Sequence, residues 1–361
     1  MIKVENLSVR FGKFHLKDIS LHLEEGAYFL LLGPSGAGKT LLLESILGIK
    51  RPDKGKVFIG NRDATCLPPE ERGVSYVPQD LVLFPHLSVL DNILFGPKMR
   101  RQTIDRHAEV TRLTRLLNIE HILDRKDVRT LSGGEKQRVA LARALITHPK
   151  VLFIDEALSA LDAHIRRDLQ QQLLKLHREL KLTIFQVTHD LDEAFLLADQ
   201  MAIMMDGQIR QVGTPDDIYR SPRDLQIAEF LLMKNVYSAL VEECLGDCRY
   251  RLMMDDLPLE IRSEGDLHRG EFVKIGIRSE DVLLLNPDEF LNSVGTVNLL
   301  PCTVDDVVKT GHVRFMRLTL SNGSGPYVDV PLAHTLIHPT APKVGDTMYI
   351  YFSPTSLCVF N

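Results

Sequence analysis

The stretch that decides the fold is Gly33-Pro34-Ser35-Gly36-Ala37-Gly38-Lys39-Thr40, a complete G-x-x-x-x-G-K-T phosphate loop. The apolar residues 28–32 precede this stretch, and the largely apolar residues 40–47 follow it and stop at Gly48. We therefore expect a strand, a loop and a helix, a setting in which glycines let backbone N–H groups face a triphosphate. There Lys39 reaches the β- and γ-phosphates, and Thr40 binds Mg²⁺.

The composition limits what the chain can be. Of its 361 residues, 44% are hydrophobic and 25% are charged, values typical of a soluble globular protein of two or three domains. The net charge of −5 indicates no strongly basic surface, so we expect no nucleic-acid partner. No apolar run approaches the roughly 18–20 residues that span a bilayer, so a membrane role requires a partner. The five cysteines lack metal-like spacing, which favours reduced thiols in a cytosolic protein.

Up to residue 235 the chain alternates apolar and amphipathic segments. Residues 151–154 form a short apolar run typical of a buried parallel strand, and residues 163–180 carry leucines at helical spacing. This alternation predicts an α/β fold with a mostly parallel sheet and nucleotide at the carboxyl ends of its strands. Further strands are expected at 1–12, 14–32, 56–59, 73–77, 183–188, 201–205 and 208–212, and helices mostly at 85–127 and from 190 to 198.

Beyond residue 235, short β-rich segments punctuated by Gly, Pro and Asp replace the alternation. Such punctuation predicts a small all-β, barrel-like domain. We therefore expect two domains, residues 1–235 and 236–361. The expected strands of the second domain are 237–241, 272–277, 295–299, 313–320 and 348–352.

Two further motifs indicate phosphate chemistry. Asp155 and Glu156 follow the apolar run 151–154, so one carboxylate can hold Mg²⁺ and the next can polarise an attacking water. Ser132, Gly133 and Gly134 precede an apolar helix and make a second anion cradle at its N-terminus. Because one triphosphate needs one cradle, the surplus cradle is explained if it faces the nucleotide of another subunit.

These motifs, and their order, make most of residues 1–235 resemble the ATP-binding cassette (ABC) family, whose signature segment the stretch 131–138 resembles. The resemblance implies a nucleotide-binding domain with a helical subdomain at about 85–150, followed by an OB-like, TOBE-type regulatory domain. It also implies a homodimer that sandwiches two ATP molecules with Mg²⁺. Each ATP then lies between one phosphate loop and the opposite Ser132/Gly134 cradle.

The resemblance assigns further roles residue by residue. Glu156 orients or deprotonates the attacking water, His189 hydrogen-bonds the γ-phosphate, and Gln79 senses both Mg²⁺ and the water. Phe11 stacks on adenine, and Asp162 ends a segment, 159–162, that crosses the dimer interface. Without the resemblance, Phe11 reads as a core aromatic, Asp162 as a helix cap and His189 as a structural residue. Mg²⁺ is then held by Thr40, Asp155 and Gln79.

Two positions depart from the family pattern. Glu135 stands where a glutamine is more usual after Ser-Gly-Gly, and Ala157 stands where a proline usually follows the catalytic glutamate. Neither change removes a ligand for phosphate or metal. Glu135 places a carboxylate near the edge of the neighbouring nucleotide, so we expect an effect on nucleotide affinity.

The transporter branch is favoured by a single cassette with a β-rich tail. Residues 84–93 and 277–282 resemble segments of importer ATPases, and residues 67–73 look most like molybdate/tungstate importers. Importers of sulfate, iron, polyamines or sugars share much of this sequence pattern. A soluble non-transport ABC protein is the competing class. The importer reading implies membrane permease subunits, a substrate-binding protein and a place at the cytoplasmic face of the membrane. Apolar residues near Phe84 are expected to form a groove for a permease helix.

The tail has two readings that the sequence leaves open. It either stabilises the dimer alone or binds intracellular oxyanion as feedback, through backbone N–H groups and a side chain such as Lys274 or Arg278.

The shared-site reading makes a complementation prediction. Chains carrying Ser132→Arg or Lys39→Ala are each expected to be inactive, because each destroys one half of every composite site. Mixing them should restore one working site per heterodimer, measured as ATP hydrolysis. If native mass spectrometry detects heterodimers and the mixture stays inactive, sites are not shared.

Overall fold

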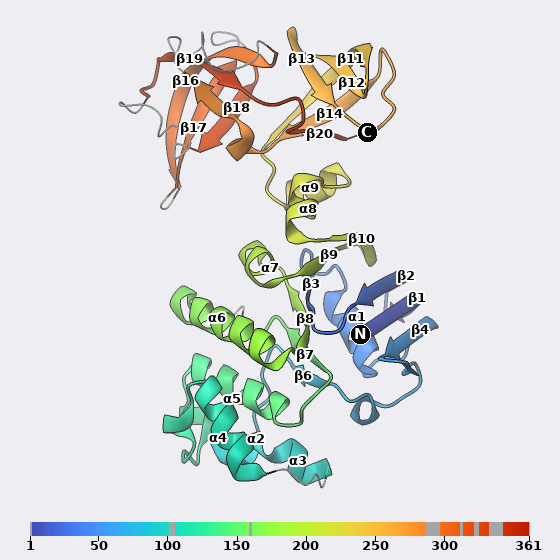
Figure 1. Ribbon diagram of the computed structural model, residues 1–361, viewed down its shortest axis with the longest axis vertical. Coiled ribbons are helices and arrows are strands. Elements are labelled where there is room, and N and C mark those ends of the chain that lie inside the picture. The colour runs from blue at the N-terminus through green and yellow to red at the C-terminus, as the bar shows by residue number, and fades with distance from the viewer. Residues whose placement is uncertain are drawn as a thin grey trace. The chain divides into compact units, whose positions relative to one another are not determined.

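The computed structural model describes residues 2–100, 105–158, 161–285, 297–310, 313–320, 325–331 and 342–360. Ser159 and Ala160, the first half of the expected interface segment, lie outside these ranges. The chain divides into two compact units, Met1–Ile218 and Tyr219–Asn361 (Figure 1). Within the described ranges, no helix is long and apolar enough to cross a membrane.

A six-stranded sheet forms the centre of the first unit, with the order β10-β9-β3-β8-β7-β6. The pairs from β9 to β6 are parallel, and only the hairpin β9–β10 is antiparallel, which confirms the predicted mostly parallel sheet. Every residue of β3, β7 and β8 is buried, as expected for strands covered on both faces. The strands are β3 (Tyr28–Leu32), β6 (Ser75–Val77), β7 (Val151–Asp155), β8 (Thr183–Thr188), β9 (Gln200–Met205) and β10 (Gln208–Gly213).

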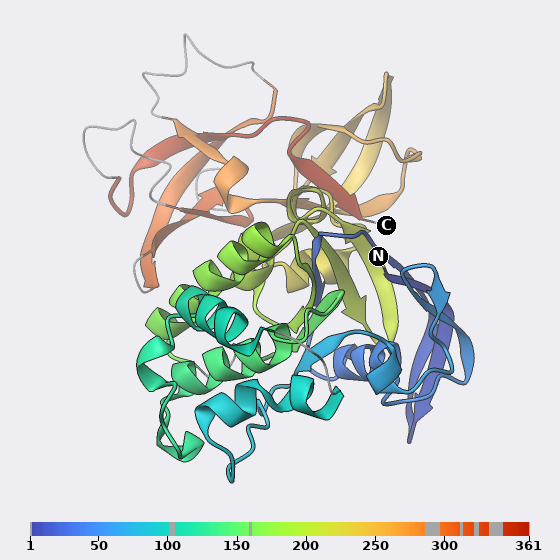
Figure 2. The same ribbon diagram turned by 60° about the horizontal axis from the view of Figure 1, so that its bottom comes forward.

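One face of this sheet packs on the helix α1 (Lys39–Leu47) and on an antiparallel sheet of order β2-β1-β4-β5. Phe29, Phe153 and Phe185 from the parallel strands share a core with Leu42 and Leu43 of α1. The antiparallel strands are β1 (Ile2–Phe11), β2 (Phe14–Leu23), β4 (Lys54–Ile59) and β5 (Arg62–Asp63), seen in blue beside α1 in Figure 2. A 3-10 turn, η1 (Pro69–Glu71), lies between β5 and β6.

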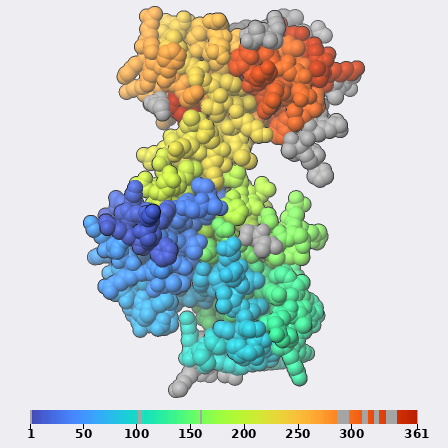
Figure 3. Space-filling view, turned by 180° about the vertical axis from the view of Figure 1, so that it is seen from behind, coloured from blue at the N-terminus to red at the C-terminus, as the bar shows by residue number. Residues whose placement is uncertain are grey.

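The opposite face of the sheet packs on α6 (Ala163–Leu180), whose Leu169, Leu173 and Leu176 are buried as the helical spacing predicts. The same core takes in a group of helices between β6 and β7. Figure 3 shows these helices in green on the same unit as the blue antiparallel strands. They are α2 (Val89–Ile93), α3 (Phe95–Arg100), α4 (Arg106–Leu116) and α5 (Gly133–Leu145), with η2 (Glu120–Ile122) and η3 (Val128–Thr130); α7 (Leu191–Leu197) follows β8.

Asp190 caps α7 by accepting a hydrogen bond from the Glu193 backbone N–H, as the sequence predicts. The Glu193 side chain is buried and accepts a hydrogen bond from Gln186 Nε2 at 2.9 Å.

The second unit contains two five-stranded antiparallel sheets, β13-β12-β11-β14-β20 and β15-β19-β16-β17-β18, which share one core. The expected all-β character is thus confirmed. The strands are β11 (Asn235–Gly246), β12 (Arg249–Met254), β13 (Leu257–Arg262), β14 (Phe272–Ile277), β15 (Leu283–Leu285), β16 (Leu299–Thr310), β17 (Val313–Leu320), β18 (Tyr327–Pro331), β19 (Thr347–Tyr351) and β20 (Leu357–Phe360). Two short helices, α8 (Pro215–Arg220) and α9 (Leu225–Phe230), and the turn η4 (Ser279–Asp281) complete the chain.

The strand expected at 295–299 is wrong over its described residues. Residues 297 and 298 form a turn, and β16 begins only at Leu299. Asn298 has a φ of 58°, and its side chain pairs with the backbone of Glu260 in β13, with both distances at 2.7 Å. The Asn298 side chain thus takes the place of a backbone partner for Glu260. Because this contact joins residues distant in the chain, β-propensity alone does not predict it.

Candidate nucleotide site

The phosphate loop requires glycine at three of its positions. A Cβ on Gly33 would overlap the backbone oxygen of Met204 in β9, so the loop can pass this strand only without a side chain. Gly36 and Gly38 have φ values of 83° and 98°, in the left-handed region that favours glycine. Gly38 is also the N-cap of α1, so backbone N–H groups at this helix N-terminus face the loop.

The hairpin turn between β9 and β10 contacts the phosphate loop through backbone atoms. Gly207 donates its N–H to Ala37 O at 3.1 Å, and its own carbonyl accepts from Lys17 N at 3.0 Å. The strands expected at 201–205 and 208–212 imply a turn at Asp206–Gly207, but the sequence does not indicate its contact with the phosphate loop. Because Met204 and Gly207 act through backbone atoms, no side-chain signal identifies them.

Lys39 is nearly buried and lies folded over the loop. Its Nζ donates to Gly33 O at 2.8 Å and to Pro34 O at 3.1 Å, and it lies 3.6 Å from Glu156 Oε1. Burial lowers the pKa of Lys39, while the nearby Glu156 opposes that shift. A cation held by two carbonyls and one nearby carboxylate can exchange these partners for an anionic ligand.

Asp155 ends β7 inside the same cluster and is also buried. Its Oδ1 accepts from Thr40 Oγ1 at 3.3 Å, and its Oδ2 accepts from Tyr76 Oη at 3.2 Å. Burial raises the pKa of Asp155, and the two hydrogen bonds oppose that shift. A hydroxyl and a carboxylate oxygen in contact form the hard donor set that Mg²⁺ prefers, so these residues fit the expected ion.

Tyr76 of β6 is a site residue that sequence reasoning missed. Its hydroxyl holds one oxygen of Asp155 and leaves the other toward Thr40. Burial, with the nearby Asp155 charge, raises the pKa of Tyr76, so this phenol remains a hydrogen-bond donor. A tyrosine in a three-residue strand carries no motif, and only the contact identifies its part.

Glu156 and His189 lie side by side because β7 and β8 are neighbouring parallel strands. His189 Nδ1 is 3.2 Å from Glu156 Oε2, and the Glu156 N–H donates to Val187 O at 3.0 Å. Glu156 has a φ of 44°, a conformation that costs a non-glycine residue free energy and concentrates at functional sites. His189 is half exposed, so it faces outward from the cluster.

Gln79 stands in an exposed loop two residues after β6. The register pairs Val77 with Ile154, and Gln79 and Glu156 each lie two residues beyond this pair, at the same sheet edge. The fold thus brings Gln79 to the edge where the phosphate loop, Asp155 and Glu156 meet. Its role toward metal and water stays a prediction.

Phe11 is at the end of β1 and is 58% exposed, which excludes the core reading of this aromatic. Lys50 Nζ lies 4.5 Å from the ring centroid. The ring therefore presents an exposed surface, as stacking on adenine requires, and the stacking itself stays a prediction.

The signature segment begins α5 with a capping box. Ser132 Oγ accepts from Glu135 N at 3.2 Å, and Glu135 Oε2 accepts from Ser132 N at 2.7 Å. Arg125 and His121 lie 3.4 and 3.7 Å from Glu135 Oε1. The Ser132 hydrogen bond chiefly lowers the pKa of Glu135. The carboxylate expected beside a neighbouring nucleotide is therefore engaged within its own helix.

The glycines of the signature also have packing roles. A Cβ on Gly134 would lie 2.7 Å from Ile165 Cγ2, and one on Gly133 would lie 3.2 Å from Leu161 Cδ2. Asp162 caps α6 by accepting from Ile165 N at 3.1 Å, so the helix-cap reading is correct for its contacts within the chain. The proposed contacts of these residues with a second chain stay predictions.

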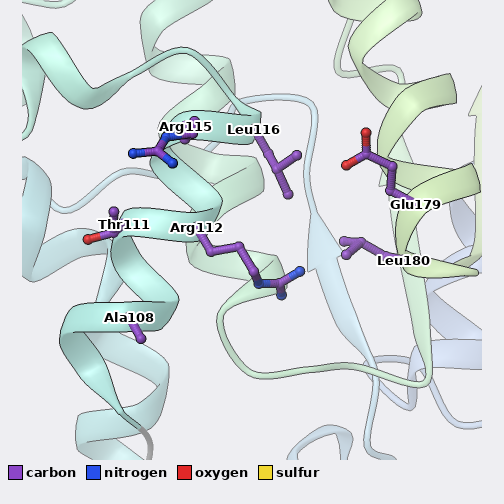
Figure 4. Close-up of a pocket in the computed structure, with 7 residues that line it drawn as sticks. All are labelled: Ala108, Thr111, Arg112, Arg115, Leu116, Glu179 and Leu180. Atoms are coloured by element: carbon purple, nitrogen blue, oxygen red, sulfur yellow. The ribbon is translucent and has the colours of Figure 1, made fainter.

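A cavity of about 380 Å³ lies apart from this cluster, between α4 and the end of α6. Figure 4 shows the residues around it, with Leu116 and the Arg112 guanidinium directed toward Leu180. Arg112 is already paired with Glu109, through Nη2 at 2.5 Å and Nε at 3.2 Å. None of the predicted site residues lines the cavity.

Comparison with known proteins agrees with this geometry. The ABC transporter family model matches residues 16–159, and the TOBE domain model matches residues 275–360. The molybdate/tungstate import ATP-binding protein WtpC of Pyrococcus horikoshii is 36% identical over 368 residues, which cover all of both chains. WtpC of Thermococcus kodakarensis is 40% identical over 294 residues, 81% of this chain and 85% of that protein.

Two further similarities bear on substrate and assembly. The spermidine/putrescine import ATP-binding protein PotA of Hahella chejuensis is 41% identical over 268 residues, 74% of this chain and 73% of that protein. A solved dimeric structure of the ATP-binding cassette MJ0796, in a post-hydrolysis state with ADP and Pi, is 28% identical with a TM-score of 0.54. It covers 60% of this chain and 99% of that one.

Buried Asp155 makes a stability prediction. Because its pKa is raised by burial, the ionised form costs stability, and this cost grows as pH rises from the ordinary aspartate pKa, about 3.9, through the folded-state pKa. Without nucleotide, Asp155→Asn should therefore raise the melting temperature by a few degrees at pH 7–8, and the gain should shrink on acidification. The exposed Asp192→Asn is the control. A lower melting temperature than wild type at pH 7 would contradict the assignment.

Proposed function

Because the chain belongs to the ABC transporter family of importer ATP-binding subunits, we propose that it hydrolyses ATP to drive uptake of molybdate or tungstate through a membrane permease. The observation that carries the substrate class is the full-length match to WtpC, which spans both units. ATP binding and hydrolysis follow from the family. The oxyanion, the permease and the reaction steps below are our proposals.

The phosphate loop supplies the binding step. Backbone N–H groups at the start of α1 donate to the phosphate oxygens, and Lys39 exchanges its carbonyl partners, Gly33 and Pro34, for the β- and γ-phosphates. Thr40, Asp155 and Gln79 would hold Mg²⁺, which when bound supplies positive charge near the leaving phosphates. Phe11 stacks on adenine from the exposed end of β1.

The hydrolytic step is assigned to Glu156, the residue with strained backbone that follows β7. Glu156 orients or deprotonates the attacking water, and its backbone φ of 44° is held by the hydrogen bond to Val187. His189 contacts Glu156 in the chain and turns toward the γ-phosphate when nucleotide binds. Gln79, at the same sheet edge, couples the occupancy of the nucleotide site to the permease.

The second half of each site comes from another copy of the chain. The capping box at the start of α5 engages the N–H groups of Ser132 and Glu135, and the N–H groups of Gly133 and Gly134, which have no partner within the helix, are proposed to bind the partner's nucleotide. The dimeric MJ0796 structure supports two cassettes as the working unit. Asp162 then belongs to the contact between copies.

The loop after Gln79 is the proposed contact with the permease. Phe84 is half-buried, with its ring centroid 4.3 Å from that of Phe95 and 5.3 Å from Arg143 Cζ, so it folds partly inward. Val82 is 57% exposed beside it. Together they offer a small apolar surface next to the site, as a coupling contact requires. A substrate-binding protein on the other side of the membrane delivers the oxyanion.

The β-rich unit is proposed to stabilise the dimer and to sense oxyanion. Arg278 is a poor ligand for this purpose because its guanidinium is buried and donates to Leu231 O and Tyr219 O, at 2.7 and 2.9 Å. Lys274 is exposed and donates to Ser238 Oγ at 2.8 Å, so it alone of the two stays accessible. Arg278 is therefore not proposed as a ligand for the oxyanion.

A polyamine importer is the second candidate, because PotA of Hahella chejuensis is as similar in identity as WtpC. The two candidates differ in the sign of the cargo's charge. Vesicles containing the full-length chain, its permease and its binding protein should take up tungstate or molybdate with ATP inside, and spermidine should not compete. Uptake of spermidine with no oxyanion uptake would replace the oxyanion assignment.

Glu156→Gln tests the hydrolytic role. The amide keeps the shape of the side chain but cannot accept a proton, so ATP hydrolysis should slow by about 10²–10⁴-fold while ATP binding persists. ATP-bound dimers should accumulate, as measured by gel filtration with labelled ATP. The exposed Glu179→Gln serves as the control. Hydrolysis at a near-normal rate would show that Glu156 is not the general base.

A further inference from the structure

Arg72 is a nearly buried arginine outside the nucleotide site. It follows η1 and lies at the end of α1 that is farthest from the phosphate loop. Its guanidinium makes four hydrogen bonds, all to backbone carbonyls: Nη1 to Ile46 O at 2.6 Å and Ser45 O at 3.3 Å, Nε to Leu67 O at 2.9 Å, and Nη2 to Thr65 O at 3.3 Å.

Two of these acceptors are the last carbonyls of the phosphate-loop helix. A helix leaves its final carbonyls without partners, and a cation there is favoured by the helix dipole. The rigid, planar guanidinium can join several carbonyls at once, which a lysine ammonium does less well. Gly48, the C-cap of α1, lies against it: a Cβ there would approach Arg72 Cζ to 2.6 Å.

The segment that begins with Arg72 returns to the other end of the same helix. Val74 joins the core around α1, Tyr76 donates to Asp155, and Asp155 accepts from Thr40 in the first turn of α1. Gln79 follows three residues after Tyr76. The helix is thus tied to this segment twice, at its C-terminus by Arg72 and at its N-terminus through Asp155.

We propose that Arg72 is a positioning residue for ATP hydrolysis, which fixes the phosphate-loop helix against β6 and the loop after it, which carries Gln79. The guanidinium does not touch nucleotide. It holds the C-terminal end of α1 to the segment 72–79, so that phosphates bound at the helix N-terminus keep their distance from Gln79. The path through Gln79 rests on the proposed function, in which this side chain acts on metal and water.

A mutant cycle tests this role with the full-length chain assembled with its permease. Arg72→Met keeps much of the volume and removes the donors, Gln79→Ala removes the group acted upon, and the double variant combines them. We expect Arg72→Met to lower kcat about tenfold, as a small misplacement of reacting groups does, with KM for ATP changing less than about twofold. In the Gln79→Ala background the same substitution should change kcat less than about twofold.

The outcomes separate three explanations. If Arg72→Met lowers only the melting temperature, Arg72 is structural and the proposal is wrong. If the full tenfold loss persists with Gln79→Ala, Arg72 does not act through Gln79, and the proposal is again wrong. If Gln79→Ala alone leaves kcat unchanged, the role assigned to Gln79 under the proposed function fails, and this inference fails with it.

Gly48→Ala disturbs the same contact from the other side and carries the cycle if Arg72→Met does not fold. Its matched control is Gly60→Ala, because Gly60 also has a positive φ, 62° against 82°, but a Cβ there meets nothing within 4 Å. Gly48→Ala should reproduce the loss in kcat and Gly60→Ala should not. Equal effects of both substitutions would mean that backbone strain, rather than displacement of Arg72, is responsible.

Discussion

The burial of two opposite charges, Lys39 and Asp155, at one edge of the parallel sheet is the constraint on which the rest of the structure depends. Removing charged groups from water is costly unless each is hydrogen-bonded or paired. The chain meets that need only in part: Lys39 has two carbonyls and the Glu156 carboxylate, 3.6 Å away, and Asp155 has two hydroxyls. Burial accordingly shifts the pKa of each group toward its neutral form. A bound phosphate and a cation would supply the missing charges.

The topology is what brings these groups together. The phosphate loop follows β3, Asp155 ends β7 and Glu156 follows it, and His189 follows β8, which lies between β3 and β7. Parallel strands thus bring these groups to one edge. A backbone hydrogen bond from Gly207, in the turn after β9, then holds the loop at Ala37, and Arg72 fixes the far end of α1. The cluster of Lys39, Asp155 and Glu156 is therefore held in place by contacts at both ends of α1.

Much of this arrangement could be predicted from the sequence, because local patterns determine it. The run 151–154 and the leucine spacing of 163–180 gave β7 and α6 nearly to the residue, and the phosphate loop specifies its own glycines. Tyr76, Gly207 and Arg72 could not be found in this way, since each acts through a contact with residues distant in the chain. The same is true of Asn298, which replaces an expected strand by a turn, and of Glu135, whose carboxylate is engaged in a helix cap.

The central claim is that one copy of this chain holds only half of each working site. Specific ATPase activity of the full-length protein, measured as the chain is diluted and matched with sedimentation at each concentration, tests it most directly. If the sites are shared between copies, activity per chain falls together with the fraction of dimers and vanishes where only monomers sediment. Activity per chain that stays constant down to the monomer range would contradict it.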